Sequence, residues 1–163
     1  MPTLHATPYD ITYAGFYFET AEEFTERMKK APFEEVEIQF IDGTDEDCLL
    51  FKLCKPHQGN VAGYFEALDT GYEGHRLAAL SYLMEYQGTT WEDATASGAL
   101  DDVDVYEMTT KELAEQFAEE GIYPAGVNEQ VLPYLDYDLL ARDLSMDYTE
   151  IECLGNTYCV RAS

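Results

Sequence analysis

Residues 103–121 read VDVYEMTTKELAEQFAEEG and place a strand directly before a helix. Val103, Asp104 and Val105 alternate between apolar and acidic side chains, which is typical of a half-buried strand, and the strand is predicted over 103–107. Thr109 and Glu112 have the spacing of a capping box, so a helix is predicted from here to Gly121. Because the strand has no evident partner nearby in the sequence, we expect it to pair with an N-terminal sheet or with a second chain.

Helices are predicted on both sides of this stretch, and a hairpin is predicted at the C-terminal end of the sequence. The expected elements are helices at 61–68, 75–86, from Thr90, at 128–134 and at 136–144, and a hairpin that pairs 148–154 with 157–161. Pro133 separates the last two helices, because proline cannot continue the hydrogen-bonding pattern of a helix. Leu154-Gly155-Asn156 supplies the turn of the hairpin.

The N-terminal segment has the pattern of strands around one helix. Residues 11–18 are rich in aromatic and β-forming side chains and are predicted as a strand. A second capping box, Thr20 with Glu23, predicts the helix that follows. Residues 36–40 alternate strictly, and we expect them to form a hairpin with a strand at Cys48–Leu53.

These elements predict the α+β class and three small units. The expected units are an N-terminal α+β unit at 1–58, a mainly helical central unit with a lone strand at 59–108, and C-terminal helices plus a hairpin at 109–163.

Negative charge dominates the composition. The 163 residues include 33 Asp and Glu against 9 Lys and Arg, a formal net charge of -24. With 46% hydrophobic residues the chain can still form a core, so disorder is disfavoured. Phosphate backbones and anionic membranes attract Lys and Arg, so direct nucleic-acid or membrane binding is disfavoured and a basic partner is favoured. On the predicted helix, Glu112, Glu115 and Glu119 form a row of like charges.

The sequence has no pattern that indicates catalysis, a cofactor or a metal site. His5, His57 and His75 lack the spacing of metal ligands, and no glycine-rich phosphate loop or nucleophile–base order stands out. We therefore expect a protein that is not an enzyme and uses no cofactor and no metal. Because no signal peptide or membrane-spanning apolar stretch is evident, we expect a cytoplasmic protein.

Four cysteines form two pairs, each with a spacing of six residues. Six residues of strand span about 20 Å, so Cys48 and Cys54 could not share a disulfide or a metal within one strand. Cys153 and Cys159 could be neighbours across the closing hairpin. Reduced, half-buried strand thiols are expected, with a structural disulfide or zinc site as the alternative.

The C-terminal third carries two short motifs. Residues 134–137 read YLDY and residues 141–144 read ARDL, after an acidic helix and a short loop and ahead of the closing hairpin. Over residues 110–163 this arrangement resembles the ArdA antirestriction family. Upstream, the order strand, helix, strand over residues 15–40 is similar to the family's N-terminal order.

The resemblance implies an elongated dimer of three-unit chains that looks like bent B-form DNA, with carboxylates placed like phosphates. Such proteins occupy the DNA-binding groove of Type I restriction-modification enzymes and block restriction, and often modification as well. The implied partner is therefore a Type I enzyme. The expected phosphate surrogates are Asp101, Asp102, Asp104, Glu107, Glu112, Glu115, Glu119, Glu120, Glu129, Asp138, Asp143 and Asp147.

Other residues are expected to build the scaffold or the homodimer. The expected motif scaffold comprises Tyr134, Asp136, Tyr137, Arg142 and Leu144. The core is expected to take Tyr134, Tyr137, Leu140 and Leu144. Arg142 lies four residues after Asp138, the spacing of a helix ion pair. Val103 and Val105, in the lone strand, are the expected dimer interface.

Two other functions fit the same charge. The chain could be a DNA mimic directed at another defence nuclease, such as a CRISPR effector, which would make it an anti-CRISPR. It could also be a generic acidic module that binds a basic protein without imitating DNA. Acidic rows on helices are in most proteins only solvated faces that promote solubility.

Overall fold

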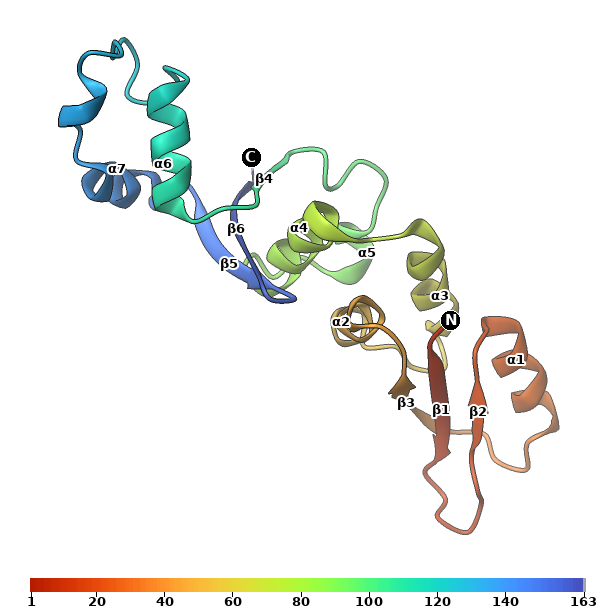
Figure 1. The fold of residues 1–163 in the computed structure, drawn as a ribbon. Helices are drawn as coiled ribbons and strands as arrows, with labels where there is room; N and C mark the ends of the chain where they lie inside the picture. Colours follow the sequence, from red (N-terminus) through yellow and green to blue (C-terminus); the bar gives the residue numbers. More distant parts are fainter. Residues whose placement is uncertain (163) are drawn as a thin grey trace. The chain divides into compact units, whose positions relative to one another are not determined.

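The chain forms two compact units, each with helices and a small antiparallel sheet, and this confirms a mixed α+β fold (Figure 1). The computed structural model describes residues 1–162. Unit 1 is Met1–Tyr72 and unit 2 is Glu73–Ser163.

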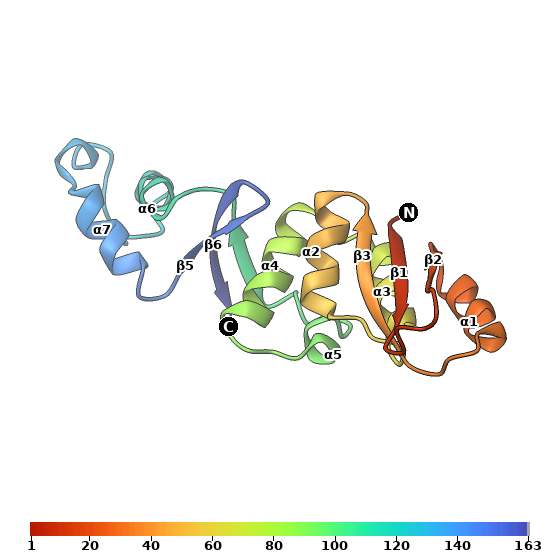
Figure 2. The same cartoon turned by 90° about the horizontal axis from the view of Figure 1, so that it is seen from below.

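Unit 1 places three strands beside three helices. Its elements are β1 (Thr3–Pro8), β2 (Phe16–Phe18), α1 (Ala21–Lys30), β3 (Val36–Asp42), α2 (Asp45–Cys54) and α3 (Val61–Thr70). The sheet has the order β2-β1-β3, and both ribbon views show β1 between its neighbours (Figures 1 and 2). Leu4 and Ala6 of β1 are fully buried. In β2, the ring of Phe18 lies 4.9 Å from that of Phe24 in α1 and 6.3 Å from that of Phe65 in α3.

The prediction that Cys48–Leu53 forms a strand paired with residues 36–40 is wrong, because this segment is part of helix α2. Thr44 caps the helix: its hydroxyl accepts from the backbone N–H of Asp47, and the Asp47 carboxylate accepts from the N–H of Thr44. Leu50 and Leu53 are buried at helical spacing. The capping box thus sets the conformation of an apolar run whose periodicity alone suits either element.

The partner of β3 is β1, a strand that the sequence patterns did not indicate. Residues 11–18 contribute only Phe16–Phe18 to the sheet, as β2. Ahead of β2, residues 9–15 form a connection in which the Asp10 carboxylate accepts from the backbone N–H and the hydroxyl of Thr12, at 3.0 and 2.7 Å. The helix predicted after Thr20 is confirmed as α1, with the Thr20 hydroxyl accepting from the N–H of Glu23.

Unit 2 is built around a second three-stranded sheet. Its elements are α4 (Gly74–Glu85), α5 (Trp91–Ala94), β4 (Val103–Tyr106), α6 (Thr110–Glu119), the 3-10 helix η1 (Leu132–Tyr134), α7 (Tyr137–Leu144), β5 (Thr149–Cys153) and β6 (Asn156–Ala162). The closing hairpin is confirmed as β5 and β6, and the sheet order is β4-β6-β5.

The expectation that β4 pairs with the N-terminal sheet is wrong, because its partner within the chain is β6 of the closing hairpin. Val103 pairs with Ala162 and Val105 pairs with Val160, so β4 is an antiparallel edge strand of the C-terminal hairpin. A boundary between residues 108 and 109 would therefore separate two paired strands. Local sequence patterns do not indicate this pairing, because about fifty residues, with α6, α7 and β5 among them, separate the two strands in the sequence.

The helix expected over 128–134 is also shorter than predicted, since only η1 at Leu132–Tyr134 is helical. The side chain of Asn128 accepts from the backbone N–H of Gln130 at 3.0 Å. Such a bond favours a turn over a helix, and Pro133 cannot donate to a helical turn.

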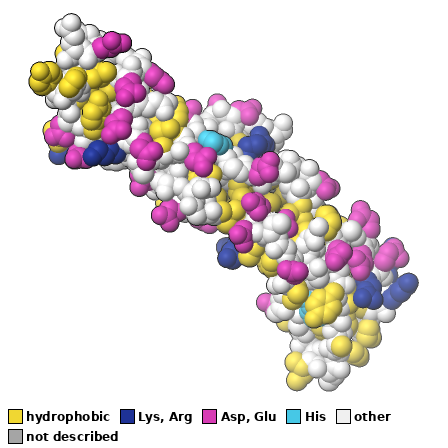
Figure 3. All heavy atoms as spheres, in the orientation of Figure 1, with side chains coloured by type: hydrophobic (Ala, Val, Ile, Leu, Met, Phe, Trp, Pro, Cys, Tyr) yellow, Lys and Arg dark blue, Asp and Glu magenta, His cyan; other side chains and the backbone are white. Residues whose placement is uncertain are grey.

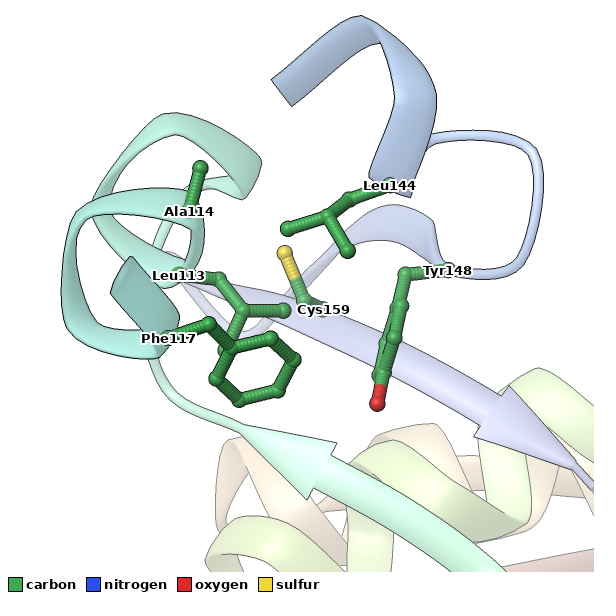
Figure 4. Packing of buried hydrophobic residues seen from close by; sticks show 6 residues of the cluster. All are labelled: Leu113, Ala114, Phe117, Leu144, Tyr148 and Cys159. Atoms are coloured by element: carbon green, nitrogen blue, oxygen red, sulfur yellow. The ribbon is translucent and has the colours of Figure 1, made fainter. Parts of the chain in front are cut away.

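Strand β6 is covered on both faces. Tyr158, Cys159 and Val160 are all buried, and consecutive strand residues point to opposite faces. On one face the ring of Tyr158 lies 5.6 Å from that of His75 in α4. On the other, Cys159 joins a cluster with α6 and α7 (Figure 4). The cluster consists of Leu113, Ala114, Phe117, Leu144, Tyr148 and Cys159.

Candidate acidic interaction surface

Unit 2 holds most of the negative charge. It contains 19 Asp and Glu residues against four Lys and Arg. Figure 3 shows Asp and Glu side chains spread across the visible face of this unit, with few Lys and Arg between them. Most of the twelve expected phosphate surrogates are exposed. The exposed ones are Asp101, Asp102, Glu107, Glu112, Glu119, Glu120, Glu129, Asp138 and Asp147, and the half-buried ones are Asp104, Glu115 and Asp143.

Helix α6 carries the row of Glu112, Glu115 and Glu119. Its N-terminus is capped as predicted: the Thr109 hydroxyl accepts from the N–H of Glu112 at 3.2 Å. The same hydroxyl lies 3.1 Å from the Glu112 carboxylate. Leu113, on the inner side of the helix, is fully buried in the cluster of Figure 4. A packed and capped helix therefore holds the row in place.

Two of the twelve carboxylates form salt bridges within residues 1–162. Lys111 Nζ lies 3.1 Å from Asp138 Oδ1, and Arg161 Nη2 lies 2.7 Å from Asp104 Oδ2. The ion pair expected between Arg142 and Asp138 is wrong, because Asp138 bonds across to α6 instead. These two carboxylates are partly neutralised within the chain and are weaker candidates for binding a basic partner.

The YLDY motif begins on the surface and ends in a helix cap. Tyr134, expected in the core, is 86% exposed, so that prediction is wrong. Tyr137 is half-buried, and its hydroxyl donates to the carbonyl of Leu132 at 3.4 Å. Asp136 is the N-cap of α7, and its carboxylate accepts from the N–H groups of Asp138 and Leu139.

The ARDL motif supplies the inner face of α7. Leu144 is buried in the cluster of Figure 4, which confirms its predicted place in the core. Leu140 is half-buried and packs against the same cluster. Arg142 is exposed in the last turn of α7, where a positive charge is favourable next to the carbonyl end of the helix. Together the two motifs build a helix that is capped by Asp136 and anchored by Leu144.

Arg161 connects the sheet to the acidic surface. Its guanidinium lies 5.0 Å from the ring centre of Tyr148 while it bonds Asp104 through Nε and Nη2. The hydrogen bond to Asp104 raises the pKa of Arg161, and burial raises the pKa of the Tyr148 hydroxyl. Arg161 is therefore a fixed cation held by an aromatic face and a carboxylate.

Each unit also contains a pocket that the sequence patterns did not reveal. One pocket of unit 1 measures about 420 Å³ and is lined by Tyr9, Asp10, Tyr13, Pro32, Phe33, Glu34 and Glu35. The pocket of unit 2 measures about 360 Å³ and is lined by Tyr106, Phe117, Ile122, Tyr123, Asp143, Leu144, Asp147, Tyr148 and Arg161. Both combine aromatic rings with carboxylates from separate stretches of sequence. Only the clustering of tyrosines at positions 9 and 13 could have drawn attention to the first.

The cysteines lie in two different settings. Cys48 and Cys54 belong to helix α2, so their expected place in a strand is wrong, while Cys153 and Cys159 lie in strands as expected. Burial raises the pKa of the Cys159 thiol, which keeps it protonated at neutral pH.

No group of three or more His, Cys, Asp or Glu residues among 1–162 is placed to hold a metal ion. Among the same residues, no helix combines the length and the apolar composition that crossing a membrane requires.

No known family model matches the chain, and no curated protein matches it either.

Proposed function

We propose that this protein is an antirestriction protein, a DNA mimic that occupies the DNA-binding groove of Type I restriction-modification enzymes. In this role it inhibits restriction and also modification. The proposal combines the resemblance of residues 110–163 to the ArdA family with the excess of exposed carboxylates in unit 2.

The carboxylate surface carries the proposal. Nine of the twelve expected phosphate surrogates are exposed, and the chain has few basic residues to neutralise them. A groove that binds DNA uses Lys and Arg to neutralise phosphates and releases condensed cations when it does so. Carboxylates held at a similar density can replace the phosphates in that exchange. The 24 net charges of one chain equal those of about twelve base pairs, since duplex DNA carries one charge per roughly 1.7 Å.

A folded acidic protein loses less conformational entropy on binding than a flexible acidic chain does. Ordering side chains and backbone on binding costs free energy, and a surface that is already ordered avoids part of that cost. The capped helices α6 and α7 supply such order. Because phosphate contacts carry no sequence information, inhibition by this surface should not depend on the recognition sequence of the enzyme.

The proposed inhibitor is an elongated homodimer, and its carboxylates follow the path of a bent duplex. In this arrangement the outer edge of β4, with Val103 and Val105, pairs with a second copy. The unpaired N–H and C=O groups of an edge strand are suited to such pairing.

Cleavage and methylation by a purified Type I enzyme test the proposal. We expect the full chain to inhibit both reactions near stoichiometric amounts. A triple variant with Glu112→Gln, Glu115→Gln and Glu119→Gln should inhibit several-fold less well, because it removes three neighbouring charges. The matched control changes the same three residues to Asp, which retains the charge and should inhibit nearly as well as the wild type.

Three results would contradict the proposal. Inhibition of a CRISPR effector but of no Type I enzyme would show that the protein mimics DNA toward a different target. Polyglutamate of equal charge that inhibits as well as the folded chain would show a generic acidic module. Absence of inhibition at excess over several enzyme specificities would exclude an antirestriction role.

A further inference from the structure

The pocket of unit 1 lies between two connections of the fold. One wall comes from the segment between β1 and β2, with Tyr9, Asp10 and Tyr13, and the other from the segment between α1 and β3, with Phe33 and two glutamates. In Figure 3, hydrophobic side chains surround the lower end of this unit, where the β1–β2 connection lies in Figure 1.

The pocket walls are tied together. The rings of Tyr13 and Phe33 lie 5.9 Å apart, and the backbone N–H of Tyr9 donates to the carbonyl of Glu35 at 3.3 Å. Behind Phe33, the ring of Phe16 stacks at 6.4 Å with an interplanar angle of 18°. The pocket therefore exists before any ligand arrives.

The charged residues that line the pocket are all acidic. Asp10, Glu34 and Glu35 line the pocket, and none of its seven lining residues is Lys or Arg. Two hydrogen bonds from Thr12 fix the carboxylate of Asp10, and they lower the pKa of this group. Aromatic faces carry a negative partial charge and attract cations, so rings and carboxylates favour the same kind of ligand.

The chain itself shows what such surroundings bind. Arg27 lies 5.3 Å from the ring centre of Phe16, and Arg161 lies 5.0 Å from that of Tyr148 while it bonds a carboxylate. At both places an aromatic ring holds a guanidinium group. The pocket of unit 1 has the same components without a cation among its lining residues.

We propose that the pocket between Tyr9, Tyr13 and Phe33 receives an arginine side chain of the basic partner protein. The guanidinium stacks on the Tyr13 and Phe33 rings, and the carboxylates of Asp10, Glu34 and Glu35 surround its charge. Arginine fits better than lysine because its planar group can stack on a ring while the N–H groups on its edge donate to a carboxylate. The identity of the partner rests on the proposed function, whereas the pocket's preference for a guanidinium does not.

Titration of the 15N-labelled full chain with Nα-acetyl-arginine amide tests the pocket directly. We expect amide shifts at residues 9–13 and 33–35. The neutral isostere Nα-acetyl-citrulline amide should not produce these shifts, because it has the same shape without the charge. Equal affinity for the two probes, or arginine shifts confined to other regions, would overturn the inference.

A pair of tyrosine variants supplies the control. Tyr13→Ser removes a pocket wall and should weaken arginine binding about threefold to tenfold, the range expected for one cation–π contact. Tyr17→Ser removes an exposed ring on β2 outside the pocket and should leave the affinity unchanged. Unchanged affinity in Tyr13→Ser, with both variants folded by circular dichroism, would contradict the proposal.

The same variants distinguish this inference from the proposed function. If the wild-type chain inhibits a Type I enzyme but does not bind the arginine probe, the pocket inference fails and the proposed function stands. If the probe binds at the pocket but the chain inhibits no Type I enzyme, the antirestriction role fails and the arginine receptor stands. With both correct, Tyr13→Ser weakens inhibition and Tyr17→Ser does not.

Discussion

Leu113 of α6 is fully buried against α7 and the second sheet, and it anchors the helix that carries the glutamate row. Removing its side chain leaves a cavity in a packed cluster. We expect Leu113→Ala to lower the free energy of unfolding by about 2–5 kcal/mol, the range for Leu→Ala in protein cores. Urea denaturation measures this loss. Leu139→Ala, on the exposed side of α7, should change it by less than about 0.5 kcal/mol, and equal losses in the two variants would contradict the packing.

Ionisation of the Cys159 thiol makes the free energy of unfolding depend on pH. Burial raises the pKa of its thiol, nearby Glu150 and Glu112 raise it further, and a hydrogen bond with Thr110 lowers it. In the unfolded chain the thiol ionises near pH 8.5, about the value of an unperturbed cysteine. Unfolding therefore releases a proton above that pH, and the contribution of Cys159 to stability, constant at lower pH, falls as the pH rises through it.

Denaturation at pH 7.0 and at pH 9.5 tests this coupling. The wild type should lose more stability between the two values than Cys159→Ala does. An equal loss in both proteins would show that the thiol has the same pKa in the folded and the unfolded chain.

Helix caps determine where several elements begin. Thr109 caps α6 through the N–H of Glu112, so we expect Thr109→Ala to cost about 1 kcal/mol of stability. Thr109→Ser keeps the hydroxyl and should retain most of that stability. Thermal unfolding of the two variants gives the comparison, and an alanine variant as stable as the wild type would contradict the role of the cap.

The same caps explain how much of the fold could be predicted. Helices α1 and α6 begin after the threonines that the sequence indicated, and the closing hairpin forms around its predicted turn. Helix α2 differs from the predicted strand although Thr44 and Asp47 form a complete capping box, because the short apolar run that follows them fits the periodicity of either element. Local signals therefore fix element ends better than short apolar periodicity does.

Pairing between distant strands could not be predicted from local signals. Strands β1 and β3 lie about thirty residues apart, and β4 and β6 lie about fifty residues apart. The candidate sites also differ in whether local sequence predicts them. The exposed carboxylates of α6 follow from helical spacing, but the arginine pocket combines residues 9–13 with 32–35, which only the folded sheet brings together.

The proposed homodimer is a property of the whole molecule, and sizing tests it. The wild type should elute at twice the 18.5 kDa of one chain. Val105→Lys, on edge strand β4, should produce a monomer because a charge opposes pairing of this strand with a second copy. Glu152→Lys, an exposed change on β5, serves as the control and should remain a dimer. A wild-type monomer at micromolar concentration would contradict the proposed interface.

Charge is the other property of the whole molecule. A surface that replaces phosphates should bind its partner less tightly as salt rises, as DNA does, because both associations release condensed ions. Single alanine changes among the exposed carboxylates should have little effect, since each contributes one charge of many.

Competition for the DNA-binding groove tests mimicry most directly. A fluorescent duplex bound to a purified Type I enzyme is titrated with the full chain, and anisotropy reports how much duplex stays bound. We expect the chain to displace duplexes with and without the recognition sequence, because the phosphate contacts that it replaces carry no sequence information. An enzyme that binds the chain and the duplex together, or a duplex that stays bound at a large excess of chain, would show that this acidic protein does not take the place of DNA.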